Sequence, residues 1–305
     1  MQSIKKQMKK NILFAFIIIT ITATSCSHKI SGNTSVAPKE EETKAKVTLT
    51  KGQKFTVENK ITTTSTSEMQ GQSMETNADI TSVYDIEVDD VTDSIYNMTN
   101  KIAAIKMNMS TMGQNINFDS EKKEDIDGEM GSNLKDYINH PNPVVMDFSG
   151  KVIVQDKKDS TQNSAPSPTA MMLKQMGDPE AQGYGAVFAF LAISKKAQPG
   201  NSWQDSTSKD GVTKVTNYTI KEIKDNLASI TISGTETRDT KIEMQGMEIS
   251  TKTSGKFSGE ETVDINTGVI LQNNTTMDAS GNISVMGQEI PTKVKATSVT
   301  TVKAM

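Results

Sequence analysis

From Val47 onward, apolar and polar residues alternate with a period of two, and this pattern limits the possible folds more than any other feature of the chain. Successive side chains of a strand point to opposite faces, so this period predicts half-buried antiparallel strands. Several runs exceed the usual strand length of about 5–6 residues, which predicts a long sheet that is strongly twisted or bulged. Apolar residues of one parity define the runs: Phe55, Val57, Ile61; Ile80, Tyr84, Ile86, Val88; Ile105, Met107, Met109; Ile230, Ile232; Ile242, Met244.

Short turn sequences separate these runs. Four of them combine Met with Gly and predict hairpins in which Gly supplies a positive φ: Met69-Gln70-Gly71-Gln72, Met112-Gly113-Gln114, Met244-Gln245-Gly246-Met247 and Met286-Gly287-Gln288. Four other turns are predicted at Lys51-Gly52-Gln53, Asp89-Asp90, Asp225-Asn226 and Ser280-Gly281-Asn282. If the Met-Gly hairpins gather at one end of the sheet, their methionines have three possible roles: packing, an apolar ligand or partner surface, or soft ligation of Cu(I).

Two stretches break the alternation and predict short covering helices. In the first, Ser132 fits an N-cap, and Leu134, Tyr137 and Ile138 have helical spacing. The second is a helical connector at 167–196, in which helices are expected at 168–176 and 186–195.

The sequences on either side of the connector resemble each other. The segment from Asp147 to Gln155 and the segment from Asp264 to Gln272 share an Asp, a Val-Ile pair and a Gln at identical spacing. We predict a mainly β fold, namely a long twisted antiparallel sheet or half-barrel that is internally duplicated, with a few short helices covering it. The duplicated domain spans 47–303, with halves at about 47–156 and 199–303.

The N-terminus has the layout of an exported protein. A basic stretch over residues 1–10 precedes an apolar stretch from Ile12 to Thr24, so residues 1–25 are interpreted as a signal peptide. Cys26, the only cysteine of the chain, follows it directly, and residues 26–46 have the composition of a disordered tether. The sequence Ala23-Thr24-Ser25-Cys26 resembles the lipobox of bacterial lipoproteins. That resemblance implies that Cys26 carries acyl chains and attaches the protein to a membrane. An ordinary signal peptide followed by a free Cys26 is the alternative.

Charge and residue types exclude several classes of function. The chain has 33 basic and 37 acidic side chains, a net charge of −4 and no basic patch, so nucleic-acid binding is excluded. His28 and His140 lack the partners that a metal site or a Ser-His-Asp triad needs. Acidic clusters at 89–93 and 121–127 are interpreted as solvated turns. No catalytic residue, metal ligand or cofactor is expected, and no ligand-binding residue is assigned.

Four features together resemble a family of uncharacterised Bacteroidota-type lipoproteins that carry a domain of unknown function. They are the lipobox, Lys51-Gly52-Gln53-Lys54-Phe55, Pro199-Gly200-Asn201-Ser202-Trp203 and the Asp264–Gly268 turn. The expected architecture is also similar to the half-barrel lipoprotein carriers of the Gram-negative periplasm.

We therefore expect a non-enzymatic protein of the cell envelope, anchored by lipid to the outer membrane and facing the periplasm or the surface. Its possible ligand is apolar or a lipid. The alternative is a module that assembles with other envelope proteins. A hydrolase that uses carboxylates such as Asp147 and Asp264 is the last candidate, although each of these residues precedes a turn, where Asp side chains accept hydrogen bonds from nearby backbone N–H groups.

Overall fold

The computed structural model describes residues 45–153 and 186–305, except 70, 112, 136, 187, 210, 245, 246 and 286. The predicted signal peptide, residues 26–44 of the tether with Cys26 and His28, and the helix at 168–176 lie outside the described residues.

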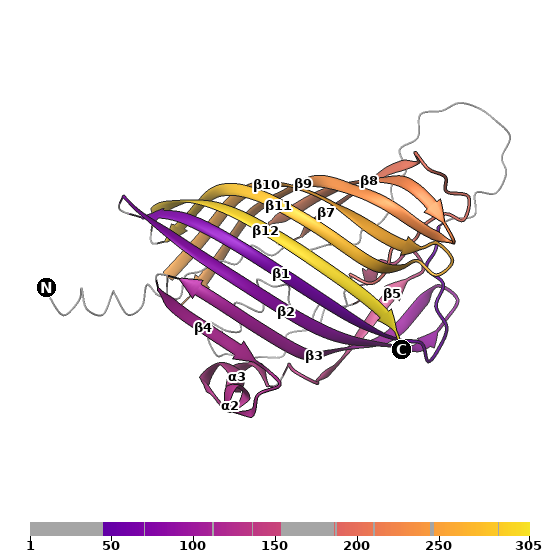
Figure 1. The fold of residues 1–305 in the computed structure, drawn as a ribbon, viewed down its shortest axis with the longest axis horizontal. Helices are drawn as coiled ribbons and strands as arrows, with labels where there is room; N and C mark the ends of the chain where they lie inside the picture. Colours follow the sequence, from indigo (N-terminus) through magenta and orange to yellow (C-terminus); the bar gives the residue numbers. More distant parts are fainter. Residues whose placement is uncertain are drawn as a thin grey trace, which may run out of the picture.

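Twelve strands form one antiparallel sheet that is not closed, which confirms the predicted mainly β fold (Figure 1). The strands run in the order β6-β5-β3-β2-β1-β12-β11-β10-β9-β8-β7, and β4 pairs with β3 outside this order. Their bounds are β1 Lys54–Met69, β2 Gln72–Val91, β3 Ile95–Thr111, β4 Gln114–Asp119, β5 Pro141–Asp147, β6 Val152–Ile153, β7 Ser202–Lys209, β8 Val212–Lys224, β9 Leu227–Met244, β10 Met247–Asp264, β11 Val269–Val285 and β12 Gln288–Ala304.

The alternation in sequence becomes an alternation in burial. In β2, for example, the residues at even positions from 78 to 88 are buried, namely Ala78, Ile80, Ser82, Tyr84, Ile86 and Val88, whereas the residues between them are exposed or half-buried. We call the buried side of the sheet its inner face. Its largest hydrophobic cluster is centred on β1, β2 and β3, and a second on β8 and β9. The sheet curves so that β7 to β9 pass behind β11 and β12 in Figure 1.

The predicted bulges are present. The strand register shifts at Val83/Tyr84 and Val88/Asp90 in β2, at Ile220/Glu222 in β8 and at Thr262/Val263 in β10. Extra residues of this kind increase local twist and bend a strand.

Glycines let the sheet bend further. A Cβ on Gly234 of β9 would lie 1.9 Å from the carbonyl oxygen of Val215 and 2.5 Å from Cζ of Phe257, its cross-strand partner. The Phe257 ring thus fills the space beside this glycine.

The hairpin turns gather at one end of the sheet. Gly71, Gly113 and Gly287 have φ of 78°, 77° and 79°, as predicted for three of the Met-Gly turns. The fourth falls on residues that are not described, although β9 and β10 pair up to Met244 and Met247 on either side of it. A fifth hairpin, with Gly211 at φ 78°, joins β7 to β8. At this end, five hairpins therefore project from a single sheet.

Two chain segments cross the opposite end of the sheet, and we call them the strap: residues 45–50 and 188–193. Val47 N donates to the Phe148 carbonyl oxygen at 2.7 Å, and Thr48 N donates to that of Thr267 at 2.8 Å. Leu191 N donates to the Gly268 carbonyl oxygen at 2.8 Å, and the Tyr96 hydroxyl donates to that of Val47 at 2.8 Å. The strap therefore links the turn after β5 to the turn after β10.

Predictions for the interruptions are partly wrong. Residues 188 and 189 form a turn, Phe190 is bridged to Val269, and no helix is present over 188–195, so the helix predicted at 186–195 is wrong. The helices found are α2 Lys123–Ile126 and α3 Glu129–Leu134, which lie beside β4. Ser132 lies inside α3, whose N-cap is Gly128, so the predicted cap is also wrong. Neither of these described helices is long or apolar enough to span a membrane.

Two of the other predicted turns are also wrong. Asp89 and Asp90 lie inside β2, where the register shifts without a chain reversal, and Ser280, Gly281 and Asn282 lie inside β11, where pairing with β10 and β12 continues unbroken. By contrast, Asp225 and Asn226 form the predicted turn, with φ of 51° and 64°.

The turns before β1 and β7 make the same hydrogen bonds. Gly52 N donates to the Val88 carbonyl oxygen at 2.8 Å, and Gly200 N donates to that of Ile220 at 2.8 Å. In both turns an amide side chain three residues ahead accepts a backbone N–H at 2.8 Å: Gln53 from Thr50, and Asn201 from Gln198.

The strand order also repeats. On each side of β12, five strands lie in reverse chain order: β6-β5-β3-β2-β1 on one side and β11-β10-β9-β8-β7 on the other. Phe55 pairs with Ile86 and Trp203 with Tyr218, so Ile86 and Tyr218 occupy corresponding positions next to these two turns. The duplication itself stays a prediction.

Candidate functional site

The inner face of β8 to β12 carries an apolar patch separate from the two larger clusters. It consists of Phe257, Met277, Ala279, Val294 and Ala296, all at most 7% exposed. These residues are neighbours across three strands, because Phe257 pairs with Met277 and Met277 with Ala296. Polar residues border this patch on both sides along the strands.

On the side toward the strap, hydrogen-bonded polar side chains cross four strands, and we call them the polar band. Asn273 Nδ2 donates to Glu261 Oε1 at 2.7 Å, and Thr275 Oγ1 donates to Asn273 Oδ1 at 2.7 Å. Further along the sheet, Ser298 and Thr300 donate to Asn59 Oδ1 at 3.0 and 3.1 Å. The polar band thus consists of Glu261, Asn273, Thr275, Ser298, Thr300 and Asn59, each at most 6% exposed.

Glu261 is the titratable member of the polar band. Burial raises the pKa of its carboxyl to about 7, and the positive charge of Lys214 only partly opposes this rise. Its Oε2 atom is buried and has no hydrogen-bond partner in the described structure. The group is therefore close to half protonated at neutral pH.

We expect the free energy of unfolding to fall by about 3 kcal/mol as the pH rises from about 4 to about 8, at about 1.4 kcal/mol for each unit of pKa difference. The ordinary pKa of 4.5 in the unfolded chain lies below the folded value of about 7, so the folded state holds its proton over the interval between them. This contribution to stability is complete below the unfolded pKa and is lost as the pH passes through the folded pKa.

Urea unfolding followed by Trp203 fluorescence would measure this pH dependence. Glu261→Gln is the matched control, since it keeps an oxygen that accepts from Asn273 but does not titrate. A pH dependence that is equal in the two proteins would contradict the assignment to Glu261.

On the side of the patch toward the hairpins lies the charged cluster, which we define as Lys214, Glu236 and Arg238. Arg238 Nη2 donates to Glu236 Oε1 at 3.1 Å, and the two side chains are 9% and 2% exposed. Lys214 Nζ lies 4.6 Å from the centroid of the Phe257 ring, within the range of a cation–π contact. The cluster therefore directly contacts the apolar patch.

Sequence reasoning did not find these groups, although the parity of the strands contains the signal. Glu261 shares its parity with Phe257 and Val263, and Arg238 shares its parity with Ile230 and Ile232. In a strand with one buried face, shared parity places a charge on the inside.

The residues that the sequence did single out have other surroundings. Asp147 Oδ1 accepts hydrogen bonds from the backbone N–H groups of Ser149 and Lys151, and Asp264 Oδ1 accepts one from Asn266 N. This confirms their predicted role in turns. His140 is exposed beside β5.

Three methionines, Met98, Met107 and Met146, are buried in the core, and each is at most 1% exposed. Packing is thus the role shown for these three. Among the described residues, no three His, Cys, Asp or Glu side chains are grouped closely enough to hold a metal ion.

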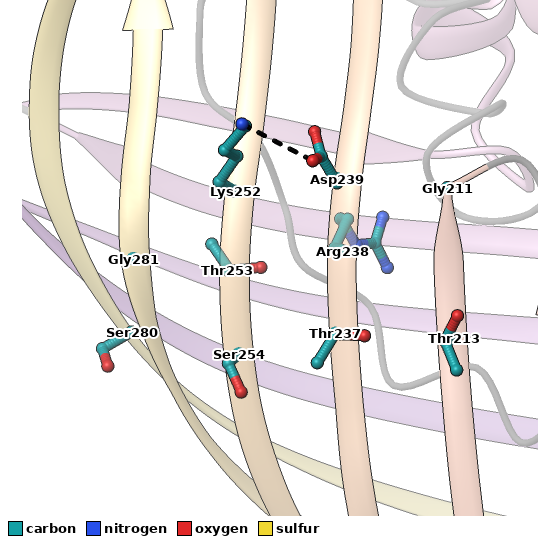
Figure 2. Close-up of a pocket in the computed structure, with 10 residues that line it drawn as sticks. All are labelled: Gly211, Thr213, Thr237, Arg238, Asp239, Lys252, Thr253, Ser254, Ser280 and Gly281. Carbon is teal, nitrogen blue, oxygen red and sulfur yellow. Dashed lines mark ion pairs between the residues drawn. The ribbon is translucent and has the colours of Figure 1, made fainter.

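The opposite face of the sheet has a shallow depression of about 630 Å³ near the hairpin end (Figure 2). Thr237 and Ser254 line it, and Lys252 Nζ lies 3.6 Å from Asp239 Oδ2, in an ion pair whose two side chains are well exposed. Arg238 of β9 is also among the residues that line the depression, although it is only 9% exposed. An exposed pair of this kind contributes little energy, so the inner face is the stronger candidate.

Comparisons with known proteins give no activity for this chain. A search of curated proteins found no match. A solved structure titled as lipid–protein interactions in lipovitellin has 10% sequence identity and a TM-score of 0.45, and the match covers 83% of this chain but only 25% of that chain. An outer-membrane channel from Pseudomonas putida F1 has 8% identity and a TM-score of 0.26, over 88% of this chain and 100% of that chain. Similarities this distant do not assign a function.

The sequence itself matches a family over residues 93–270, from the start of β3 to the start of β11. The matched segment is more than half of the chain. The protein belongs to this family, which is described as a family of unknown function (DUF6263).

Proposed function

We propose that this protein is a non-enzymatic lipoprotein of the bacterial cell envelope whose inner face binds an apolar ligand or lipid. The apolar patch on β10 to β12 is the observation that supports this function most. Pockets for small molecules are mostly apolar and carry a few polar groups that orient the ligand. Here five apolar side chains lie between the polar band and the charged cluster.

Native mass spectrometry of the protein isolated from its own cells tests the binding function. We expect an added mass that disappears after extraction with organic solvent. Met277→Glu, which places a charge in the apolar patch, should abolish the added mass, whereas Thr276→Glu on the opposite face should keep it. If the unaltered protein shows only its own mass under gentle conditions, the binding function is refuted.

Membrane attachment through Cys26 is the second part of the proposal. It is supported by the position of the only cysteine directly after the expected signal peptide. Growth with an alkyne-bearing palmitate analogue should label the protein and leave Cys26→Ala unlabelled. Label that persists in Cys26→Ala would contradict this part without affecting ligand binding.

A second candidate function is assembly with other envelope proteins through the hairpin end. The five hairpins that project from the same end of the sheet favour it. Crosslinking from a photoreactive residue at position 71 should then capture one reproducible envelope partner, whereas the same residue at position 226, at the opposite end, should not. Absence of a reproducible partner from position 71 would remove the support for this candidate.

A further inference from the structure

The charged cluster is buried on the inner face of the sheet, where Lys214 contacts Phe257 of the apolar patch. Arg238 is the only Arg among the 33 basic residues of the chain, and it is 9% exposed. Lys214 and Glu236 are 5% and 2% exposed. Burying charges is costly unless each one is fully paired and hydrogen-bonded, so any unpaired atom in this cluster requires an explanation.

Two atoms of the cluster are unpaired. Arg238 Nε, a donor, and Glu236 Oε2, an acceptor, are buried and have no hydrogen-bond partner in the described structure. The pair itself is held by a single bond, from Arg238 Nη2 to Glu236 Oε1. One donor of a positively charged group and one acceptor of a negatively charged group, from residues two positions apart on β9, are thus buried without a partner.

The ligand chemistry follows from these two atoms. A purely anionic head group would satisfy Arg238 but would be repelled by Glu236, and a purely cationic head group would have the opposite problem. An uncharged head group would compensate the charges of Arg238 and Glu236 only weakly. A head group with both charges satisfies both atoms, because each forms a charge-assisted hydrogen bond or ion pair with its complement.

The charged cluster lies beside the apolar patch. Glu236 pairs with Gly255, and Gly255 with Ala279, which is a member of the apolar patch. Glycine at position 255 leaves the strand without a side chain between the cluster and the patch. A ligand held by its head at Glu236 and Arg238 would therefore lie with its tail on Ala279, Met277 and Phe257.

We infer that the charged cluster binds the head group of a zwitterionic amphiphile, with the anionic group at Arg238 and the cationic group at Glu236. The acyl tail lies on the apolar patch, and its far end faces the polar band. This inference rests on the proposed binding function and specifies the ligand class.

A series of amphiphiles that share one tail tests the inference. The probes are dodecylphosphocholine, dodecyl phosphate, dodecyltrimethylammonium and dodecyl maltoside, each below its critical micelle concentration. The full chain carries Cys26→Ala, so that no acyl chain of its own competes for the patch. Binding is measured by titration calorimetry. We expect dodecylphosphocholine to bind about tenfold more tightly than each of the other three, a difference of about 1.4 kcal/mol.

The variant Arg238→Met/Glu236→Met removes the head-group site and keeps the volume of the side chains. Replacing both members of a buried ion pair with apolar residues is often neutral for stability, so the fold should persist. We expect this variant to bind dodecyl maltoside as before and to lose its preference for dodecylphosphocholine. If the variant does not fold, the four probes on the protein with its ion pair intact still decide the question.

The outcomes separate the inference from the binding function. Equal affinity for all four probes would overturn the head-group assignment and leave apolar binding in place. Tightest binding of dodecyl phosphate would show an anion site and would also overturn the assignment. Failure of all four probes to bind would refute both proposals, and an unchanged preference in the folded double variant would place the head group elsewhere.

Discussion

Replacing Arg238 alone with Met should lower the free energy of unfolding by about 3–5 kcal/mol. The substitution leaves the Glu236 carboxylate 2% exposed and without the guanidinium that now lies 3.1 Å away. An uncompensated buried charge is far more costly than the loss of the whole pair, because desolvation of the remaining group is no longer offset. Replacing both residues with Met should restore most of the lost stability.

Urea unfolding of the two variants, followed by Trp203 fluorescence, would measure the difference. The matched control is Lys54→Met, which breaks an ion pair of 2.8 Å with Glu87 between side chains that are nearly half exposed. Pairs of this kind contribute about 0–1 kcal/mol, so this variant should be close to neutral. If Arg238→Met lowers the free energy of unfolding by no more than Lys54→Met does, the ion pair between Arg238 and Glu236 is not desolvated in solution.

Phe190→Ala should lower the free energy of unfolding by about 3–5 kcal/mol, through lost apolar contacts and the cavity left behind. Phe190 is fully buried, and its ring lies edge-on to that of Phe55, with centroids 5.4 Å apart at 83°. Its neighbour in the chain bonds to the start of β11: Ile270 N donates to the Ala189 carbonyl oxygen at 2.8 Å. Loss of the ring should therefore loosen the strap.

The same unfolding assay, combined with amide hydrogen exchange at Leu191 and Ile270, would test this prediction. Leu227→Ala is the control, since Leu227 is 36% exposed at the turn between β8 and β9. We expect a change within about 0.5 kcal/mol for that variant. If Phe190→Ala loses less than about 1 kcal/mol and exchange at Leu191 stays slow, the strap does not depend on this ring.

Most of the sheet could be predicted from sequence because one face is buried. A slip of one residue would move Phe55 and Val57 outward, so the period of two determines which face of β1 lies inside. The strap could not be predicted in the same way. Residue 186 and residues 188–193 are buried, and a continuous apolar run has no period that separates an extended segment from a helix.

The candidate site depends on pairing between strands, which a single sequence does not contain. The parity of Glu261 places it inside, but its partner Asn273 follows only from the register of β10 and β11. Similarly, Lys214 and Phe257 come together across β9, although 43 positions separate their numbers in the chain. The bulge at Ile220/Glu222 also interrupts the parity along β8.

The position of β12 has a consequence for synthesis of the chain. In the described sheet, β12 alone joins β1 to β11, so the last of the described strands in chain order joins two sets of strands that are made earlier (Figure 1). Thr301 pairs with both Glu58 and Gln272, and the first of these contacts spans nearly the whole domain. Contacts between such distant parts of a chain form slowly. Until β12 has been made, the nascent protein therefore holds two unjoined sheet edges, and a chaperone that binds exposed strands would act during this interval.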